Sequence, residues 1–539
     1  MLAEQWRGLL EINCWPIFAV ALHSLRKAPA YWAALAPGTS RMAAGKVAEG
    51  GVIRRHDIAG RIFRRLLDAR KFLATNYTTI PAAVILAGLA PDRKHPRWDR
   101  TDWDDSASVG SLRIVDPACG SGTLLMAVVQ DVPKRHRHAD GSGDTQGPVI
   151  KALLESALYG FDVVPAAVHL AAATLSMSET KQAISHMPIF WMPHDVREGR
   201  PRLRSLDFLP TSPGKGKAQF MQLFPDHEAD PGRMSGTGEW IHDAFMPEEC
   251  DLVIANPPYK RAGGPGSAEN TDWNPLFGSV LSESDAGLMR QALKKTLGPT
   301  SGSLYAGLGS AFLVLGHERL RVGGRLAFVL PATALTGSLW GPIRKLLLDH
   351  YRIDWVVVSH DPRNRSARRN LPGRRFVAFS ESTRIAETLI VATRTPPSAG
   401  RDGMVRFVNL RRNPDEPIDA LGVTRALLAS RERGSSAQSA EITLGSSVWG
   451  ETRFVQQGEL DARPWPHVAF VRSRLTEVAL DLRSSGELRV DFKRVSLSIR
   501  TLREICELGP YEMQIKNPSS GLFSIVETED PTRSGHPAS

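Results

Sequence analysis

The stretch Asn256-Pro257-Pro258-Tyr259 combines groups that could hold a planar amine. An Asn side-chain carbonyl and a neighbouring backbone carbonyl can each accept one N–H bond from an –NH2 group. The two prolines stiffen the loop and have no N–H to compete for these bonds, and the Tyr ring can stack on a base. The pattern favours a site that holds an exocyclic amine for methyl transfer; a Pro-rich turn after a strand is the structural alternative.

The residues before this tetrapeptide predict where it lies in the fold. Asp251-Leu252-Val253-Ile254-Ala255 is a short, mostly apolar run of the kind that forms a buried parallel strand. The tetrapeptide would then follow the carboxyl end of a strand, which is where open α/β sheets bind ligands.

A second candidate site lies upstream, in a strand–turn–helix unit. The predicted strand Leu112–Val115 is followed by the turn Asp116-Pro117-Ala118-Cys119-Gly120-Ser121-Gly122-Thr123 and by a helical run, Leu124–Val129. The glycines permit close approach of a ligand, and the helix N-terminus offers free N–H groups. The turn matches neither the dinucleotide fingerprint nor a P-loop. Asp116 would repel phosphates but can pair with an amino group, which fits the methionine end of S-adenosylmethionine better than a nucleoside triphosphate.

Together the two motifs resemble those of the γ-type DNA adenine-N6 methyltransferases. This family includes the methylation subunits of type I restriction–modification systems and the fused type IIG enzymes, and the resemblance covers roughly residues 55–395. It implies S-adenosylmethionine as cofactor, double-stranded DNA as substrate and a flipped-out adenine as methyl acceptor. It also implies that Tyr77 and Thr78 border the carboxylate end of the cofactor, although Thr79 stands where the family has Pro.

Two further acids are candidates for cofactor binding. Leu158–Asp162 reads as a strand that ends in an acid, and a carboxylate at that position can accept bonds from both ribose hydroxyls. Similar family segments place the Asp of Ser205-Leu206-Asp207-Phe208 near the adenine amino group, with Asp195 as a close rival. The predicted cofactor-binding residues are Tyr77, Thr78, Asp116, Ala118, Gly120, Gly122, Asp162 and Asp207. The predicted catalytic residues are Asn256, Pro257, Pro258 and Tyr259, and no metal is implied.

The remaining elements predict an α/β fold. Apolar runs at 189–192, 323–331, 353–358 and 387–393 alternate with helical runs, among them 305–320 and 342–350. Such alternation is typical of a doubly wound, mostly parallel sheet, here a Rossmann-like class I methyltransferase in which 387–393 is, by resemblance, the antiparallel strand. We expect a helical N-terminal region at 1–95, the catalytic domain at 96–395, and a small C-terminal extension at 396–539 that could hold part of a target-recognition region.

An arginine-rich loop precedes the last of these strands. Six arginines fall within Arg363–Arg375, which favours binding to DNA phosphates over a merely solvated basic loop. We expect Arg365, Arg368 and Arg369 to contact DNA. Related enzymes bring an aromatic residue from this region over the second face of the flipped base. Either Phe376 or Phe379 could serve, and Phe379 is counted among the expected DNA-binding residues, with core packing as the alternative for each.

The amino-acid composition limits the expected partners and cellular compartment of the protein. The net charge of +10 favours an anionic partner such as nucleic acid. The four cysteines are scattered and suggest neither disulfides nor a metal cluster, and the apolar run Trp15–Leu25 is too short to span a bilayer. A cytoplasmic protein with no membrane partner is expected. Because little of the chain remains after the catalytic domain, a specificity or restriction subunit could supply target recognition.

Two other functions remain open at this point. Glutamine-N5 and RNA-amine methyltransferases also use Asn-Pro-Pro-Tyr on the same fold, although the Gly-rich loop and the upstream Tyr-Thr segment are typical of the DNA enzymes. The chain could also be a DNA-binding subunit of a defence complex that depends on partners for activity.

Overall fold

The computed structural model describes a little more than half of the chain. It covers residues 77–91, 96–131, 146–179, most of 182–210, 246–259, 282–298, most of 304–361, most of 379–433 and 439–465, with residues 38 and 42 and short strands within 232–242 and 487–496. Most of the predicted N-terminal helical region and the arginine-rich loop lie outside these residues. The chain divides into two compact units, 1–473 and 474–539, and the second is described only by the hairpin β17 (Glu487–Val490) and β18 (Lys493–Ser496).

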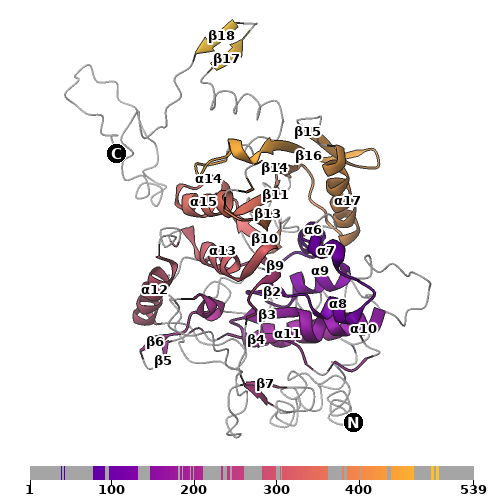
Figure 1. Cartoon of the computed structure of the whole chain (residues 1–539), viewed down its shortest axis with the longest axis vertical. Coiled ribbons are helices and arrows are strands. Elements are labelled where there is room, and N and C mark those ends of the chain that lie inside the picture. The colour runs from indigo at the N-terminus through magenta and orange to yellow at the C-terminus, as the bar shows by residue number, and fades with distance from the viewer. Residues whose placement is uncertain are drawn as a thin grey trace, which may run out of the picture. The chain divides into compact units, whose positions relative to one another are not determined.

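A ten-stranded mixed sheet forms the centre of the larger unit (Figure 1). Its strands, in spatial order, are β15 (Ser439–Leu444), β16 (Ser447–Gln456), β14 (Met404–Leu410), β11 (Tyr351–Ser359), β13 (Glu387–Arg394), β10 (Leu320–Pro331), β9 (Cys250–Ala255), β2 (Ile114–Asp116), β3 (Leu158–Asp162) and β4 (Ile189–Trp191). The five strands from β10 to β4 run parallel to one another. β13 runs antiparallel between β10 and β11, so the predicted doubly wound α/β class is confirmed, antiparallel strand included.

The direction of winding changes between β2 and β9. These strands pair in parallel, with Ile114 opposite Leu252 and Val115 opposite Val253. From β2 the chain proceeds to β3 on one side, and from β9 it proceeds to β10 on the other. Such a switch point opens a crevice at the carboxyl ends of the two strands, and the two predicted motifs follow these strands directly.

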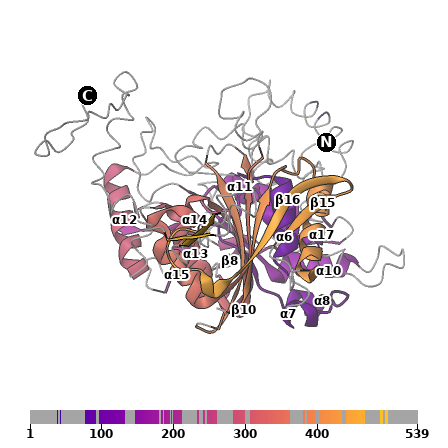
Figure 2. The same ribbon diagram turned by 90° about the horizontal axis from the view of Figure 1, so that it is seen from above.

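Helices cover both faces of the sheet (Figure 2). One apolar core contains residues of α6 (Ile80–Leu89), α9 (Thr123–Asp131), α11 (Pro165–Ser176) and α17 (Pro417–Arg433), and the other contains residues of α12 (Glu283–Leu297), α13 (Leu308–Arg319) and α15 (Gly341–His350). Strand β9 contributes to both cores in alternation, because Leu252 and Ile254 face one and Val253 and Ala255 face the other. No described helix is both long and apolar enough to cross a membrane.

The sheet continues past the predicted boundary at residue 395. β14 pairs in parallel with β11, and β16 and then β15 extend the sheet in antiparallel pairs. Trp465 is fully buried, and its backbone N–H donates to Leu335 O (2.8 Å). α17 packs on α6 and ends at Arg433. Residues 404–465 are therefore structurally part of the unit that holds the candidate site.

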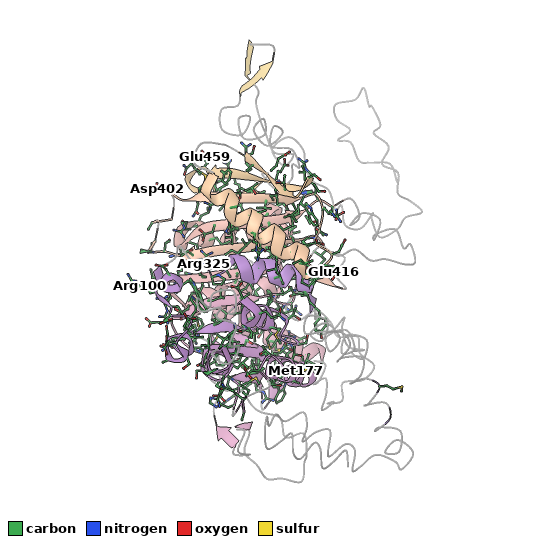
Figure 3. The ribbon with its side chains drawn as sticks, turned by 90° about the vertical axis from the view of Figure 1, so that its right-hand side faces the viewer. Arg100, Met177, Arg325, Asp402, Glu416 and Glu459 are labelled. Carbon is green, nitrogen blue, oxygen red and sulfur yellow. The ribbon has the colours of Figure 1, made fainter. Side chains whose placement is uncertain are left out.

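Arg325, on β10, is a fully buried cation in the middle of the larger unit (Figure 3). Its Nε donates to Ala90 O (2.6 Å) and its Nη2 to Leu89 O (3.0 Å), at the end of α6. Its Nη1 donates to the carboxylate of Asp354 on β11 and to the hydroxyl of Thr393 on β13. One side chain thus joins α6 to three adjacent strands, and it requires its counter-charge because an unpaired buried charge is costly.

Asp354→Ala should destabilise the larger unit by about 3–5 kcal/mol, because it leaves the Arg325 guanidinium buried without its carboxylate. Denaturant titration monitored by tryptophan fluorescence would measure this. Lys345→Ala is the control: it removes an exposed ion pair with Asp349, which should cost less than about 1 kcal/mol. Equal losses in the two variants would contradict this role for the buried pair.

Candidate functional site

The switch point brings four separate segments together. The Gly-rich turn follows β2 and the tetrapeptide follows β9, while β1 (Tyr77–Thr78) pairs antiparallel with β12 (Ser380–Glu381). Thr78 lies opposite Ser380 in this pair, and the side chain of Asn256 contacts both. Segments about 180 and 125 residues from the tetrapeptide in sequence therefore form its immediate surroundings.

Asn256 is buried at the centre of a polar cluster. Its Nδ2 donates to Thr78 Oγ1 (3.0 Å) and Ser380 Oγ (2.8 Å), and its Oδ1 accepts from the Tyr259 hydroxyl (2.9 Å). The Tyr259 oxygen also lies 2.9 Å from Glu387 Oε1, at the start of β13. The second carboxyl oxygen, Glu387 Oε2, accepts from the backbone N–H of Ser380 (2.8 Å). The carboxamide is thus held on every side by short polar contacts.

Burial changes the proton affinities within this cluster. Desolvation raises the pKa of the Glu387 carboxyl to about 7, although hydrogen bonds from Ser380 and Tyr259 lower it. Desolvation, together with the nearby Glu387 carboxylate, raises the pKa of Tyr259 well above its usual value. The phenol therefore keeps its proton at neutral pH, and the acid carries a proton over a far wider pH range than an exposed glutamate.

The Gly-rich turn is fixed by backbone contacts to β3. Cys119 N–H donates to Phe161 O (2.9 Å), and Gly120 N–H donates to Asp162 Oδ2 (2.9 Å). Gly120 has φ +53° and Gly122 has φ +82°, conformations that suit glycine. At Gly120 a side chain would point toward the Tyr77 ring, with Cβ 3.7 Å from Tyr77 Cε1. The turn therefore presents bare backbone next to β1, as a close-fitting ligand requires.

One carboxyl oxygen of Asp116 is available to accept a hydrogen bond from a ligand. Its Oδ1 accepts from Ala118 N–H (3.0 Å), while its Oδ2 is buried and has no hydrogen-bond partner within the described part of the chain. Desolvation raises the pKa of Asp116 well above its usual value, and the neighbouring Asp162 adds to this effect. A buried, unsatisfied acceptor beside a glycine turn suits a ligand with an ammonium group.

The segment Arg204–Phe208 closes over the ends of β2 and β3 as a single 3-10 turn. Ser205 Oγ donates to Pro117 O (2.5 Å), and Asp207 Oδ2 accepts from Leu203 N–H (2.9 Å). Arg204 is 7% exposed and has φ +62°. Burial lowers the pKa of Arg204 to about 10, against the opposing effect of Asp162. The segment thus adds a buried cation next to the acid at the end of β3.

Most of the predicted site residues within the described chain converge here. The structure gathers Tyr77, Thr78, Asp116, Ala118, Gly120, Gly122, Asp162, Asp207 and the tetrapeptide 256–259 around the carboxyl ends of β2, β3 and β9. Phe379 is 1% exposed and belongs to the core cluster on the α6 face, an environment that matches its packing alternative; its stacking role stays a prediction. Arg365, Arg368, Arg369 and Asp195 lie outside the described residues.

Three contributors were not predicted from the sequence. Glu387 was identified only as the start of a strand, and Ser380 and Arg204 were not identified at all. An acid as the first residue of a mostly apolar strand could have indicated Glu387 as a site residue. Strand β13 is buried from Glu387 to Thr393. Arg204 and Ser380 carry no comparable signal, because long-range folding brings them to the site.

Neither a protein-family model nor a curated protein matches this chain. Among solved structures, it is similar to the modification subunit of a type I restriction enzyme from Vibrio vulnificus YJ016, with 14% identity over 71% of this chain and a TM-score of 0.37. It is also similar to the methyltransferase subunit of a type I restriction–modification system from Streptococcus thermophilus (16% identity, 72% of this chain, TM-score 0.36). The type IIG restriction endonuclease BpuSI matches 80% of this chain at 14% identity and a TM-score of 0.41. The chain spans 58% of the length of each of the two subunits and 37% of BpuSI.

The two glycines of the turn should differ in their tolerance of alanine. At Gly122 a Cβ would lie 3.1 Å from both Cα and Cβ of Ala171 on α11 as well as straining the backbone, whereas Gly120 has no contact closer than the Tyr77 ring. Gly122→Ala should cost about 2–3 kcal/mol and Gly120→Ala about 1 kcal/mol. Denaturant titration of both variants tests this, and a larger loss for Gly120→Ala would contradict the packing argument.

Proposed function

We propose that this chain is an S-adenosylmethionine-dependent methyltransferase that methylates the N6 amine of a flipped-out adenine in double-stranded DNA. The observation that carries the proposal is the meeting of two loops at the switch point. One offers a buried acid and bare glycine backbone, and the other offers an oriented Asn followed by two prolines and a tyrosine. The setting we propose is restriction–modification or phage defence.

The loop after β2 supplies what the amino-acid end of the cofactor needs. Asp116 Oδ2 would accept from the cofactor ammonium group, and the backbone of Ala118, Gly120 and Gly122 would line its path next to Tyr77 and Thr78. Asp162 is proposed to bind the ribose and Asp207 the adenine end. Both carboxylates now hold backbone N–H groups, and a carboxylate has acceptor sites left for a ligand as well.

The tetrapeptide supplies the amine-binding groups. The side-chain oxygen of Asn256 and the carbonyl of Pro257 would accept the two N–H bonds of the target amine. These bonds keep the nitrogen lone pair directed at the incoming carbon, and the Tyr259 ring would stack on the base. The cofactor supplies the methyl group on a positively charged sulfur, which makes it a strong electrophile. Positioning and polarisation then account for most of the catalysis.

Partners follow from the same reasoning. The base must leave the duplex to reach a buried Asn256, which is 6% exposed, so we propose double-stranded DNA as the macromolecular substrate. The arginine-rich loop, with Arg365, Arg368 and Arg369, is proposed to bind its phosphates. A specificity or restriction subunit is the proposed protein partner.

Cofactor binding should release protons. The carboxyl of Asp116 keeps its proton to unusually high pH in the free protein, and a bound ammonium group would favour its ionised form. Calorimetric titration with S-adenosylmethionine in buffers of different ionisation enthalpy should show release of a fraction of a proton, with affinity rising as pH rises. The Asp116→Asn variant should bind at least about tenfold more weakly and release fewer protons. Unchanged affinity and proton release in that variant would remove Asp116 from the cofactor site.

Asn256→Ala should lower methyl transfer by at least about 100-fold while sparing cofactor binding, because only the amine-binding oxygen is lost. The assay uses tritiated S-adenosylmethionine with mixed-sequence duplex DNA, followed by nucleoside digestion and chromatography. Asn413→Ala, at a buried Asn outside the site, is the matched control and should retain activity. Label in N6-methyladenine supports the proposal. Label only in RNA or protein substrates, or full turnover by Asn256→Ala, would overturn it.

A further inference from the structure

Glu387 makes a contact whose hydrogen-bond direction depends on whether its carboxyl group carries a proton. The Tyr259 oxygen lies 2.9 Å from Asn256 Oδ1 and 2.9 Å from Glu387 Oε1. Both of these atoms are acceptors when Glu387 is ionised, whereas a phenol has one proton to donate. With Asn256 Oδ1 facing Tyr259, as in this structure, the second short contact requires a second proton, and a neutral Glu387 carboxyl supplies it by donating to the Tyr259 oxygen.

The same proton fixes how the Asn256 amide is turned. A carboxamide fills the same space with its oxygen and nitrogen exchanged, and its hydrogen-bond partners decide between the two orientations. With Glu387 neutral, the Tyr259 hydroxyl donates to Asn256 Oδ1, and Nδ2 donates to the hydroxyl oxygens of Thr78 and Ser380. With Glu387 ionised, the Tyr259 hydroxyl turns to the carboxylate, and Asn256 satisfies the cluster by presenting Nδ2 to Tyr259 and Oδ1 to the two hydroxyls.

The two orientations of the Asn256 amide leave different hydrogen-bonding groups free, an acceptor in one and a donor in the other. In the first, both N–H bonds of Asn256 are used and one lone pair of Oδ1 remains, so the side chain can still accept a bond. In the second, both lone pairs of Oδ1 are used and one N–H remains, so the side chain can only donate. A primary amine that must keep its lone pair for a methyl group needs the first.

We propose that Glu387 is a positioning residue: its neutral carboxyl group, acting through the Tyr259 hydroxyl, holds Asn256 in the orientation that leaves an acceptor free for the target amine. This deepens the proposed function and rests on it for the identity of the amine. Burial supports the neutral form, since Glu387 is 3% exposed and its pKa is raised to about 7.

Tyr259 is the titratable group that Glu387 contacts. His360 and Asp361 follow the end of β11, where Val358 pairs with Thr388, so they lie at the same end of the sheet as Glu387; the pKa of Glu387 is nevertheless set by desolvation and by hydrogen bonds from Ser380, Tyr259 and Phe379. The charged group of β10 lies far along the sheet, because Arg325 pairs with Thr393 whereas Glu387 pairs with Pro331. Six residues of strand separate the two levels, or about 20 Å. Asp354 and Arg352 of β11 belong to the same distant end, and α6, on the adjacent face, consists of IPAAVILAGL without a charge. The Glu387 proton thus responds mainly to burial and to its hydrogen bonds.

Glu387→Gln separates a proton switch from a purely structural role. A Gln amide can accept from the Ser380 N–H through its oxygen and donate to the Tyr259 oxygen through its nitrogen, as the neutral acid does at every pH. We expect the full-length wild type to lose methyl-transfer activity on duplex DNA as pH rises through about 7, by about 30-fold at a pH 1.5 units higher. Glu387→Gln should match the wild type at about pH 6 and lack this loss. Glu451→Gln, at a buried acid of β16, should keep the wild-type profile.

Two results would overturn the inference. One is a Glu387→Gln variant that binds S-adenosylmethionine normally but is inactive at every pH, which would mean that the ionised carboxylate is needed. The other is a variant that keeps the wild-type loss of activity, which would assign the titration to another group.

A readout independent of activity separates failure of this inference from failure of the proposed function. A carboxyl whose pKa is raised from 4.5 to about 7 on folding stabilises the fold fully below pH 4.5, and this contribution is lost as pH rises through about 7. The melting temperature of the wild type should therefore fall relative to that of Glu387→Gln between about pH 5 and pH 8, with most of the fall below about pH 7. This shift together with no methyl transfer to any substrate would reject the proposed function but keep the buried proton. A constant difference in melting temperature would reject the proton itself.

Discussion

The parallel pairing of β2 with β9 is the constraint on which the candidate site depends. Each strand ends in a loop with distinct chemistry, an acid and glycines after β2 and an amide, prolines and a tyrosine after β9. Strands paired in parallel end at the same edge of the sheet, so residues 140 apart in sequence, Asp116 and Asn256, become neighbours in the fold. The paired strands hold the two loops side by side, so neither loop has to fold over the other.

Around that edge, the buried acids accept hydrogen bonds mainly from backbone N–H groups. Asp162 accepts from Gly120 and Val164 N–H groups, Asp207 from Leu203, and Glu387 from Ser380. Such bonds compensate for the loss of water around a carboxyl group without demanding a counter-charge. The contrast is with Arg325, deep between strands and helix, which has an acid as its partner. The site thus keeps several acids whose proton content can change, whereas the core holds a neutralised pair.

Much of this arrangement could be read from local sequence. The strands at 158–162 and 250–255 were predicted at or within a residue of their observed bounds, because apolar runs ending at turn residues identify strands directly. The helix after β1 starts at Ile80, where Thr79 caps it through Ala82 N–H (3.3 Å). What could not be read depends on pairing across long sequence separations. The residues around Glu387 do not predict its contact with Tyr259, 128 residues away. Those around Arg204 likewise do not predict a buried residue with positive φ. The attachment of β14 to β11 is of the same kind, since a strand's partner is not encoded in its own residues.

The pairing of β14 with β11 limits where this chain could be divided into separate modules. β11 is paired on both sides, with β13 and with β14, and its residues from Ile353 to Val358 are buried. A boundary drawn at residue 395 would strip one side of this strand and leave its backbone N–H and C=O groups open to pairing with another chain. A separable module would therefore have to begin after Trp465, whose side chain is buried in the same core as residues of α15. The unit that holds the candidate site therefore extends some seventy residues past the end of β13 at Arg394, and a seam between modules would fall beyond that point.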